Sequence, residues 1–450
     1  MKNQYYKLRV LREGLITTIQ DNGFIKLQHL GITTGGAIDD FSYKLGNIIL
    51  SNKTNTPSIE FAKLGPKFLV EHGSLNIAIT GNVNFLLKLK GRNVQGSTNR
   101  SYFLDEGDEI DVQSTQNSNY GYIAIKKGFL TSSFENSSST LISSQIGGNN
   151  GKKISANQLI TGISSLKSLN YQYKEIDYEP TRFIRVIKGP QMHFFKIKDI
   201  KNFFKKEFEI SDHINRTGIR LINNIVKPLK SYNIDSEGII RGSIQIPGDG
   251  NPIVLACDHP TIGGYPKIAI VIMADFGKLV QLPSHTKFFF KEITILEAER
   301  LLIDYQNRLN NLPKPSGALV FYSALKKENM INICSNHYQF INEEFGSLFI
   351  SLSEEGDGRA PLGEITLIAS IFTRTQDWFD LEKDHYIFKK NQYLNKISKA
   401  LEEKFNIDSE DWLHRELSTP RSFERWTNRP NGMVGGLGQN PDIFGLFGLS

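Results

Sequence analysis

The sequence has few cysteines and no long apolar run, and these two absences narrow the class of protein. Its only cysteines are Cys257 and Cys334, too few for a disulfide framework or a four-cysteine zinc site. The longest apolar stretch, Ile268–Ala274, is seven residues, whereas a helix that crosses a bilayer needs about 20. Residues 1–15 are polar and lack the apolar core of a secretory signal. We therefore expect a cytoplasmic protein without a membrane segment.

Common cofactor and nucleophile motifs are also missing. There is no G-x-G-x-x-G that follows a strand and opens a helix, no H-E-x-x-H, no C-x-x-C and no G-x-S-x-G. Gly147–Lys153 comes nearest to a phosphate loop, but it lacks the glycine at 146 and the hydroxyl residue after Lys152. His29 and His259 are interpreted as ordinary polar residues. The sequence therefore predicts no metal site and no Rossmann-type cofactor site.

What the sequence does contain is an uneven distribution of charge. The whole chain has a net charge of +6, but residues 1–311 carry +10 and residues 312–450 carry −4. At about 150 residues per domain, the length predicts two to three domains, and the change of sign favours a boundary near residue 312. The basic excess is mild, and Lys196–Lys206 has the apolar spacing of an amphipathic helix, so we expect no nucleic-acid partner.

Residues 1–311 are predicted to be mainly β-structure with some helix. Leu75–Thr80 and Val83–Leu89 alternate around Gly81 and Asn82, a pattern that predicts a hairpin. Further strands are predicted at Tyr120–Lys126, Arg182–Lys188, Ile239–Ile246, Pro252–Ala256 and Lys267–Ala274. The short spacings favour a barrel or sandwich over a doubly wound sheet.

Helices are fewer, and a proline-rich segment divides the chain. Helical spacing is found at Phe41–Leu50, Phe194–Phe204 and Ile295–Leu309, the first of them capped by Asp39 or Asp40. Asn310–Gly317 is predicted to be a linker. Beyond it we expect strands at Ala318–Ser323, Ser347–Leu352 and Glu364–Thr373 and a helix at Trp378–Phe405. The expected domains are residues 1–165, 166–311 and 312–450.

The segment 237–281 holds the densest group of candidate site residues. Two apolar strands flank a tight turn at Pro247–Pro252, and the second strand ends at Asp258. Gly263 and Gly264 expose backbone N–H groups, and Lys267 beside them suits a phosphate or carboxylate. Asp258 is a candidate base or polar anchor that could pair with Lys267. The alternative is a turn-rich barrel end with a solvated lysine and a capping aspartate.

This segment resembles the biotin-dependent carboxyltransferase family, which includes the C-type subunit of 5-oxoprolinase and allophanate hydrolase subunit 2. The resemblance extends in order over about residues 8–300. Its other motifs are Gly14–Gly23, Gly31–Ile32, Gly36–Asp39, Asn47, Ile59–Glu60, Gly65–Pro66, Arg185–Gln191 and Asn215–Leu221.

The resemblance implies carboxyltransferase subdomains A (1–165) and B (166–311) with a cyclophilin-like β-barrel. It also implies a subunit that works only with B-type and A-type partner subunits, in the ATP- and Mg²⁺-dependent opening of 5-oxo-L-proline to L-glutamate. Asp258 and Lys267 are the catalytic candidates. The candidates for binding substrate or nucleotide are Gln191, Arg216, Gln245, Asp249, Gly263, Gly264 and Tyr265.

Two other functions of the family stay open. One is transfer of a carboxyl group to a urea-like substrate. It requires a separate biotin carrier, because no Ala-Met-Lys-Met acceptor for attached biotin occurs in this chain. The other is a non-catalytic antagonist of a kinase inhibitor, favoured by departures from the family pattern. The departures are Asn22, Phe24, His193 and Asn215.

The C-terminal part resembles a different family. Ser418–Gly436 is similar to the late portion of carotenoid desaturase/isomerase-type flavin oxidoreductases, whose substrate-side domain would contain the strands at 319–322 and 365–373. The dinucleotide fingerprint that would bind the pyrophosphate of FAD is missing. We therefore expect residues 312–450 to be an α+β fragment that binds no FAD.

Overall fold

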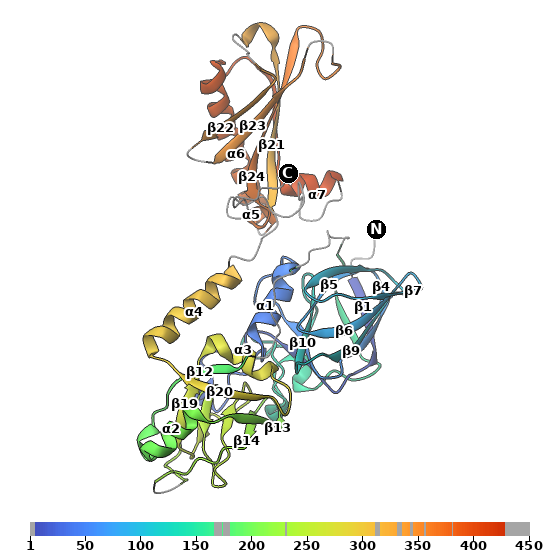
Figure 1. Cartoon of the computed structure of the whole chain (residues 1–450). Coiled ribbons are helices and arrows are strands. Elements are labelled where there is room, and N and C mark those ends of the chain that lie inside the picture. Colours follow the sequence, from blue (N-terminus) through green and yellow to red (C-terminus); the bar gives the residue numbers. More distant parts are fainter. Residues whose placement is uncertain are drawn as a thin grey trace. The chain divides into compact units, whose positions relative to one another are not determined.

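The computed structural model describes residues 5–165, 173, 181–229, 232–310, 316–330, 335–342, 345–354, 357–379 and 381–427. These residues form two compact units, one ending at residue 310 and the other beginning at 316 (Figure 1). The first unit contains two large open sheets, a two-stranded ribbon and a closed barrel, and the second contains a single sheet. Within the described ranges, no helix combines the length and apolar character that a bilayer span requires.

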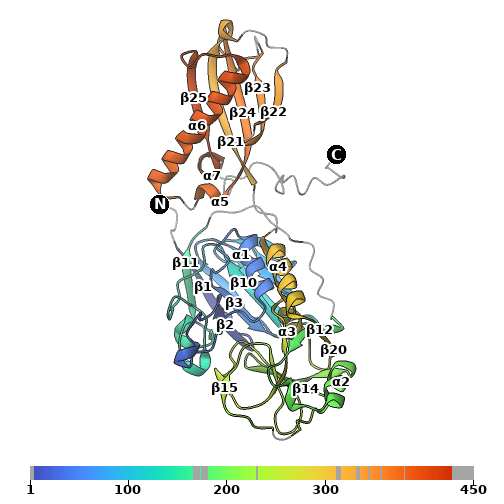
Figure 2. The same cartoon turned by 90° about the vertical axis from the view of Figure 1, so that its left-hand side faces the viewer.

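The N-terminal half of the first unit is a sandwich of two antiparallel sheets (Figure 2). One sheet has the order β11-β1-β4-β9-β6-β7, with β1 (Tyr5–Arg12), β4 (Lys67–His72), β6 (Val83–Leu89), β7 (Arg92–Gln95), β9 (Glu109–Thr115) and β11 (Leu159–Ile163). The other has the order β2-β3-β10-β5-β8, with β2 (Ile16–Gln20), β3 (Ser58–Ala62), β5 (Leu75–Thr80), β8 (Arg100–Leu104) and β10 (Tyr120–Ile125). Their facing apolar side chains form one shared core.

The predicted hairpin at 75–89 is wrong, although both strands lie where they were expected. β5 pairs with β8 and β10 in one sheet, and β6 pairs with β7 and β9 in the other. Gly81 takes φ 95° and lets the chain cross between the sheets. β5 is buried along its whole length, because the sandwich core covers one face and α1 (Asp40–Ile49) packs on the other.

The C-terminal half of the first unit is a closed barrel of order β12-β19-β16-β17-β14-β13-β20. Its strands are β12 (Phe183–Lys188), β13 (Phe208–Ile214), β14 (Gly218–Ile222), β16 (Ser243–Gln245), β17 (Ile253–Leu255), β19 (Lys267–Val271) and β20 (Lys287–Glu292). A parallel pair, β12 with β20, closes it. The helix α2 (Ile197–Lys205) contributes Phe203, which stacks on Phe290 inside the core at 5.0 Å between ring centroids.

Helices connect the two halves of this unit. Asp39 caps α1 as predicted, accepting from the backbone N–H of Ser42. Its other carboxylate oxygen accepts a 2.8 Å hydrogen bond from Gln281, the last residue of α3 (Met273–Gln281). This helix was not predicted, and the strand expected to reach Ala274 ends at Val271. The expected helix at 295–309 is present as α4 (Ile295–Asn310).

The second unit is a five-stranded antiparallel sheet of order β22-β23-β24-β21-β25 (Figure 2). It contains β21 (Ser316–Lys326), β22 (His337–Asn342), β23 (Gly346–Leu352), β24 (Glu364–Arg374), β25 (Trp412–Ser418), α5 (Gln376–Phe379), α6 (Lys383–Phe405) and α7 (Pro420–Thr427). The predicted strands are thus confirmed, and the long helix is confirmed from Lys383 to Phe405, whereas Trp378 belongs to the short helix α5. Residues 311–315 of the linker, Cys334, and the segment 428–450 lie outside the described residues.

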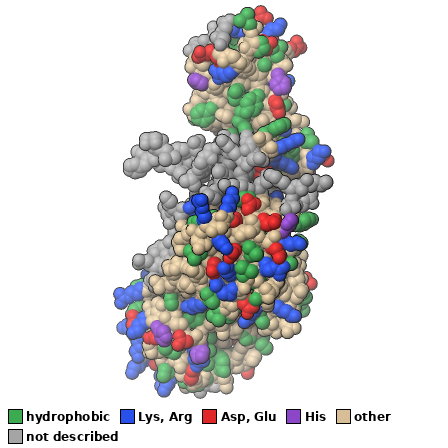
Figure 3. All heavy atoms as spheres, turned by 90° about the vertical axis from the view of Figure 1, so that its right-hand side faces the viewer, with side chains coloured by type: hydrophobic (Ala, Val, Ile, Leu, Met, Phe, Trp, Pro, Cys, Tyr) green, Lys and Arg blue, Asp and Glu red, His purple; other side chains and the backbone are tan. Residues whose placement is uncertain are grey.

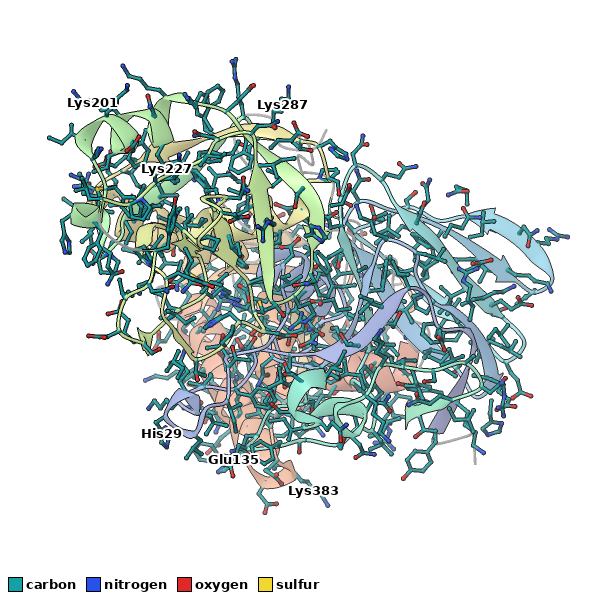
Figure 4. All side chains as sticks on the ribbon, turned by 90° about the horizontal axis from the view of Figure 1, so that it is seen from below. His29, Glu135, Lys201, Lys227, Lys287 and Lys383 are labelled. Atoms are coloured by element: carbon teal, nitrogen blue, oxygen red, sulfur yellow. The ribbon has the colours of Figure 1, made fainter. Side chains whose placement is uncertain are left out.

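Much of the basic charge of the first unit covers the outer surface of the barrel. Figure 3 shows Lys and Arg side chains gathered at the lower left of the displayed face, where the barrel lies. In Figure 4, Lys201 of α2 and Lys287 of β20 lie at the outer edge of the barrel. His29 lies at the periphery, in keeping with an ordinary polar side chain.

Candidate functional site

Two groups of polar side chains occupy the first unit where the sequence motifs meet. We call Gln191, Glu237, Gln245, Gly263 and Lys267 the lysine cluster, and Gly36, Glu60, Tyr122, Arg216 and Asp258 the arginine cluster. In the lysine cluster, Gln245 and Lys267 lie on barrel strands, whereas Glu237 and Gly263 lie on a separate two-stranded ribbon. The arginine cluster joins the barrel to the sandwich.

Strand register brings the lysine cluster together. Lys267 opens β19 and lies opposite Gln245, the last residue of β16. Gln191 follows β12, and its side-chain Oε1 accepts a 3.2 Å hydrogen bond from the backbone N–H of Lys267. The side chains of Gln191, Gln245 and Lys267 are all buried. Three nitrogen donors are therefore held at one end of the barrel, within neighbouring strands and turns.

Glu237 is the counter-ion of Lys267. The Lys267 side chain is 4% exposed, whereas that of Glu237 is 43% exposed, and the ammonium donates to Glu237 Oε1. Gln191 Nε2 donates to the same oxygen at 2.6 Å. The hydrogen bond from Lys267, chiefly, holds the pKa of the Glu237 carboxyl below its ordinary value. A buried ammonium needs such a partner, because an uncompensated charge in the interior costs several kcal/mol.

A short ribbon carries Glu237 to this position. β15 (Glu237–Gly238) pairs only with β18 (Ile262–Gly263) among the described strands, with Glu237 opposite Gly263. A Cβ on Gly263 would lie 2.7 Å from Gln245 Nε2, so the glycine leaves room for this amide. Gln245 Nε2 is buried and has no hydrogen-bond partner within the described structure. An unused buried donor beside a buried lysine suits an anionic ligand.

We expect Gly263→Ala to disturb the site more than the fold. The added methyl group would displace the end of the flexible Gln245 side chain, which costs little stability but moves a donor. The unfolding free energy should change by less than about 1 kcal/mol, while activity in a reconstituted assay falls. Gly238→Ala is the control, because a Cβ there meets nothing within 4 Å. Equal activity of the two variants would contradict this view of Gly263.

The arginine cluster is a buried ion-pair network between the sandwich half and the barrel half of the first unit. The guanidinium of Arg216 donates to both oxygens of Asp258 at 2.8 Å, to Glu60 Oε1 at 2.5 Å and to the carbonyl of Gly36 at 2.8 Å. Glu60 Oε2 also accepts from the Tyr122 hydroxyl at 2.8 Å. Burial alone would lower the pKa of Arg216, yet the adjacent carboxylates raise it well above its ordinary value.

This geometry corrects the predicted pairing of Asp258 with Lys267. Each residue has another partner: Arg216 for Asp258 and Glu237 for Lys267. Because the guanidinium engages both oxygens of Asp258, the arrangement favours a polar anchor over a base. Gly36, Glu60 and Arg216 come from three motifs of the family pattern, and their shared contact gives those motifs a common structural role.

Cys257 and His259, on either side of Asp258, are buried inside the protein. Burial raises the pKa of the Cys257 thiol, whose sulfur is 3.3 Å from a donating nitrogen of Arg241. Burial lowers the pKa of His259, whose Nδ1 lies 2.5 Å from the carbonyl oxygen of Pro260. No group of three or more metal-ligating side chains occurs within the described ranges. These contacts indicate packing roles.

The remaining predicted site residues are not all brought together. Asp249 lies in the turn after β16, where it forms an exposed pair with Arg220 and accepts from the backbone N–H of Asn251. These contacts lie within the turn and the neighbouring strand and do not reach the lysine cluster, so Asp249 is best described as a turn residue. Gly264 and Tyr265 connect the ribbon to β19, and Tyr265 is partly exposed.

Sequence reasoning missed Glu237 as part of the site. The residue stands 30 positions before Lys267, and only the pairing of β15 with β18 brings it to the ammonium. Its signal was weak: a single acidic residue opening the glycine-rich segment. Glu60 was noted within a motif, but its partner Arg216 is 156 positions away.

Comparison with known proteins supports the family resemblance. The family described as carboxyltransferase domain, subdomain A and B, matches residues 30–292. The chain is 31% identical over 285 residues to the C-type subunit of 5-oxoprolinase from Haemophilus influenzae, covering 63% of this chain and 90% of the relative. It is 28% identical over 311 residues to the corresponding 5-oxoprolinase subunit from Escherichia coli, covering 68% and 97%.

Structural similarity extends to a larger enzyme. The crystal structure of the K. lactis urea amidolyase matches with a TM-score of 0.63 and 24% identity, over 69% of this chain and 20% of the other. This likeness concerns the fold alone, and the chain spans about a fifth of that protein. The family match ends at residue 292, so the resemblance of residues 313–450 to flavin oxidoreductases stays a prediction.

Proposed function

This chain belongs to the carboxyltransferase domain family, subdomains A and B, and from that premise we propose that it is the C-type subunit of an ATP-dependent 5-oxoprolinase. Two relatives with that name are matched over almost their whole length. The proposed reaction opens 5-oxo-L-proline to L-glutamate. It needs B-type and A-type partner subunits, and ATP with Mg²⁺ acts in the assembled complex.

The buried Lys267 beside the unused amide of Gln245 is the observation that carries this proposal. A substrate with a carboxylate, or a phosphate group from ATP, offers the negative charge that this donor set accepts. Gly263, Gly264 and Tyr265 shape the approach to Lys267, and Gln191 orients it. In this scheme Arg216 and Asp258 act at a distance from the substrate, by holding the sandwich and the barrel together.

Two of the four departures from the family pattern, Phe24 and Asn215, form their contacts outside the lysine cluster. Phe24 is buried against Phe134, with ring centroids 6.3 Å apart. Asn215 accepts hydrogen bonds from the backbone N–H groups of Thr217 and Gly218 at 2.8 and 3.0 Å, as an aspartate there would also do. Both of these substitutions serve local structure, whereas His193 lies two residues after Gln191 of the lysine cluster.

A reconstitution assay tests the proposed function. The full chain is mixed with candidate B-type and A-type subunits, and ATP hydrolysis is measured with and without 5-oxo-L-proline. We expect hydrolysis that depends on 5-oxo-L-proline only when all three proteins are present. Equal hydrolysis after omission of this chain would refute the proposal.

Carboxyl transfer to urea is the second candidate, favoured by the fold likeness to urea amidolyase. The same purified chain can be tested with a carboxylated biotin carrier and urea, with 5-oxo-L-proline as the alternative acceptor. Loss of carboxyl groups from biotin that depends on urea, together with no 5-oxoproline-dependent ATP hydrolysis, would favour this candidate over the first.

A further inference from the structure

The lysine cluster contains a buried donor that no acceptor of the described structure uses. Lys267 and Gln191 both donate to a single carboxylate oxygen, Glu237 Oε1, and Gln245 Nε2 donates to nothing in the described structure. A carboxylate or phosphate from outside brings two or more oxygens. It could therefore satisfy the third donor, which Glu237 leaves unpaired.

Glu237 differs from the residues that it contacts in its access to water. Its side chain is 43% exposed and comes from a two-residue strand, whereas the side chain of Lys267 is 4% exposed and begins a strand of the closed barrel. If Glu237 turns into solvent, water can hydrate its carboxylate. Leaving Lys267 without a counter-ion would leave a buried charge uncompensated, which is strongly unfavourable. The glutamate can leave only when another anion takes its position.

We propose that Glu237 is an internal substitute for the anionic group of the ligand, and that ligand binding exchanges this carboxylate for that of the ligand on Lys267. The exchange excludes uncharged ligands, because they would leave the buried ammonium of Lys267 without a counter-ion. It also makes the apparent affinity depend on how often Glu237 is displaced. The inference rests on the proposed function for the identity of the ligand, but the anion site itself does not.

Calorimetric titration of the full chain tests the exchange. The probes are 5-oxo-L-proline, inorganic phosphate and 2-pyrrolidinone, which has the same ring as 5-oxoproline without its carboxylate. Glu237→Gln keeps the shape of the side chain and removes its charge. We expect this variant to bind at least one of the two anions about tenfold or more tightly than wild type, and 2-pyrrolidinone to bind to neither protein.

Matched variants give the controls. Glu292→Gln removes a similar carboxylate on the same barrel, 38% exposed and paired with Lys188 at 3.2 Å, and should leave the affinity unchanged. Combining Glu237→Gln with Lys267→Met should abolish anion binding. Glu237→Asp has a shorter side chain that draws the carboxylate back from Lys267, so it should show a smaller gain in anion affinity. It is the variant to use if Glu237→Gln unfolds at a lower temperature than wild type.

The outcomes separate this inference from the proposed function. Tighter binding of phosphate without binding of 5-oxo-L-proline supports the exchange and counts against the 5-oxoprolinase substrate. Affinity in Glu237→Gln equal to wild type overturns the exchange, as does binding that survives loss of Lys267. Absence of anion binding to every variant overturns it too, and then only the reconstitution assay bears on the function.

Discussion

Replacing Arg216 with methionine is expected to lower the free energy of unfolding of the first unit by about 3–5 kcal/mol. Methionine retains much of the length of the side chain but removes the charge that Glu60 and Asp258 share. Both carboxylates would then face each other across a buried interface without a cation. Removing one member of a buried ion-pair network leaves the other charges uncompensated and strongly lowers the free energy of unfolding. Replacing all members with apolar residues has a much smaller effect on that free energy.

The chain provides its own internal control for this measurement. Its three tryptophans, Trp378, Trp412 and Trp426, all belong to the second unit. In urea titrations, tryptophan fluorescence therefore follows the second unit, while far-ultraviolet circular dichroism follows both. We expect Arg216→Met to move the transition of the first unit and leave the fluorescence transition in place.

Arg220→Met is the matched substitution. Arg220 lies on β14, four residues after Arg216, but its pair with Asp249 is 35% and 42% exposed. Exposed pairs typically contribute no more than about 1 kcal/mol. If both variants lost the same stability, the bridging role of the arginine cluster would be wrong.

Lys267→Met should have the largest effect on activity. Under the proposed function, the buried ammonium binds an anionic group of the substrate or nucleotide. Loss of one partner of a desolvated charge pair costs about 2–5 kcal/mol. We therefore expect the 5-oxoproline-dependent ATP hydrolysis of the reconstituted complex to fall about a hundredfold or more. The fold should survive, because Glu237, the partner left behind, is half-exposed and can be hydrated.

Lys188→Met provides the comparison for activity. Its side chain is exposed on the same barrel and pairs with Glu292, so its loss should change the rate by less than about twofold. Activity of Lys267→Met within about threefold of wild type would remove Lys267 from the site, whatever the outcome for Arg216.

Local patterns in the sequence predicted elements well but their partners poorly. The alternation at 75–80 and 83–89 predicted two strands with correct bounds. Whether they pair with each other depends on which sheet each one joins, and the alternation of a single strand carries no record of that. The cap at Asp39 was predictable because it involves Ser42, only three residues away.

The site shows the same division between short-range and long-range information. Gly263, Gly264 and Lys267 were identified because they lie within a few residues of one another. The counter-ion of Lys267 could not be identified, because the pairing of β15 with β18 that brings Glu237 to it joins residues far apart in sequence. Asp258 was paired with the nearest lysine in sequence, whereas folding supplied an arginine from the neighbouring strand end.

The separate cores of sandwich and barrel have a consequence for the kinetics of unfolding. The sandwich core draws on the sandwich half alone, while the barrel core also includes Ile38 and Tyr120 from that half, so most of each core can condense before the two meet. The contacts of Arg216 with Gly36 and Glu60 span 180 and 156 positions and would then form after the rate-limiting step of folding. Interactions absent from the transition state govern how fast a native protein opens. The arginine cluster would therefore act mainly on the lifetime of the folded protein, by slowing the separation of the sandwich from the barrel.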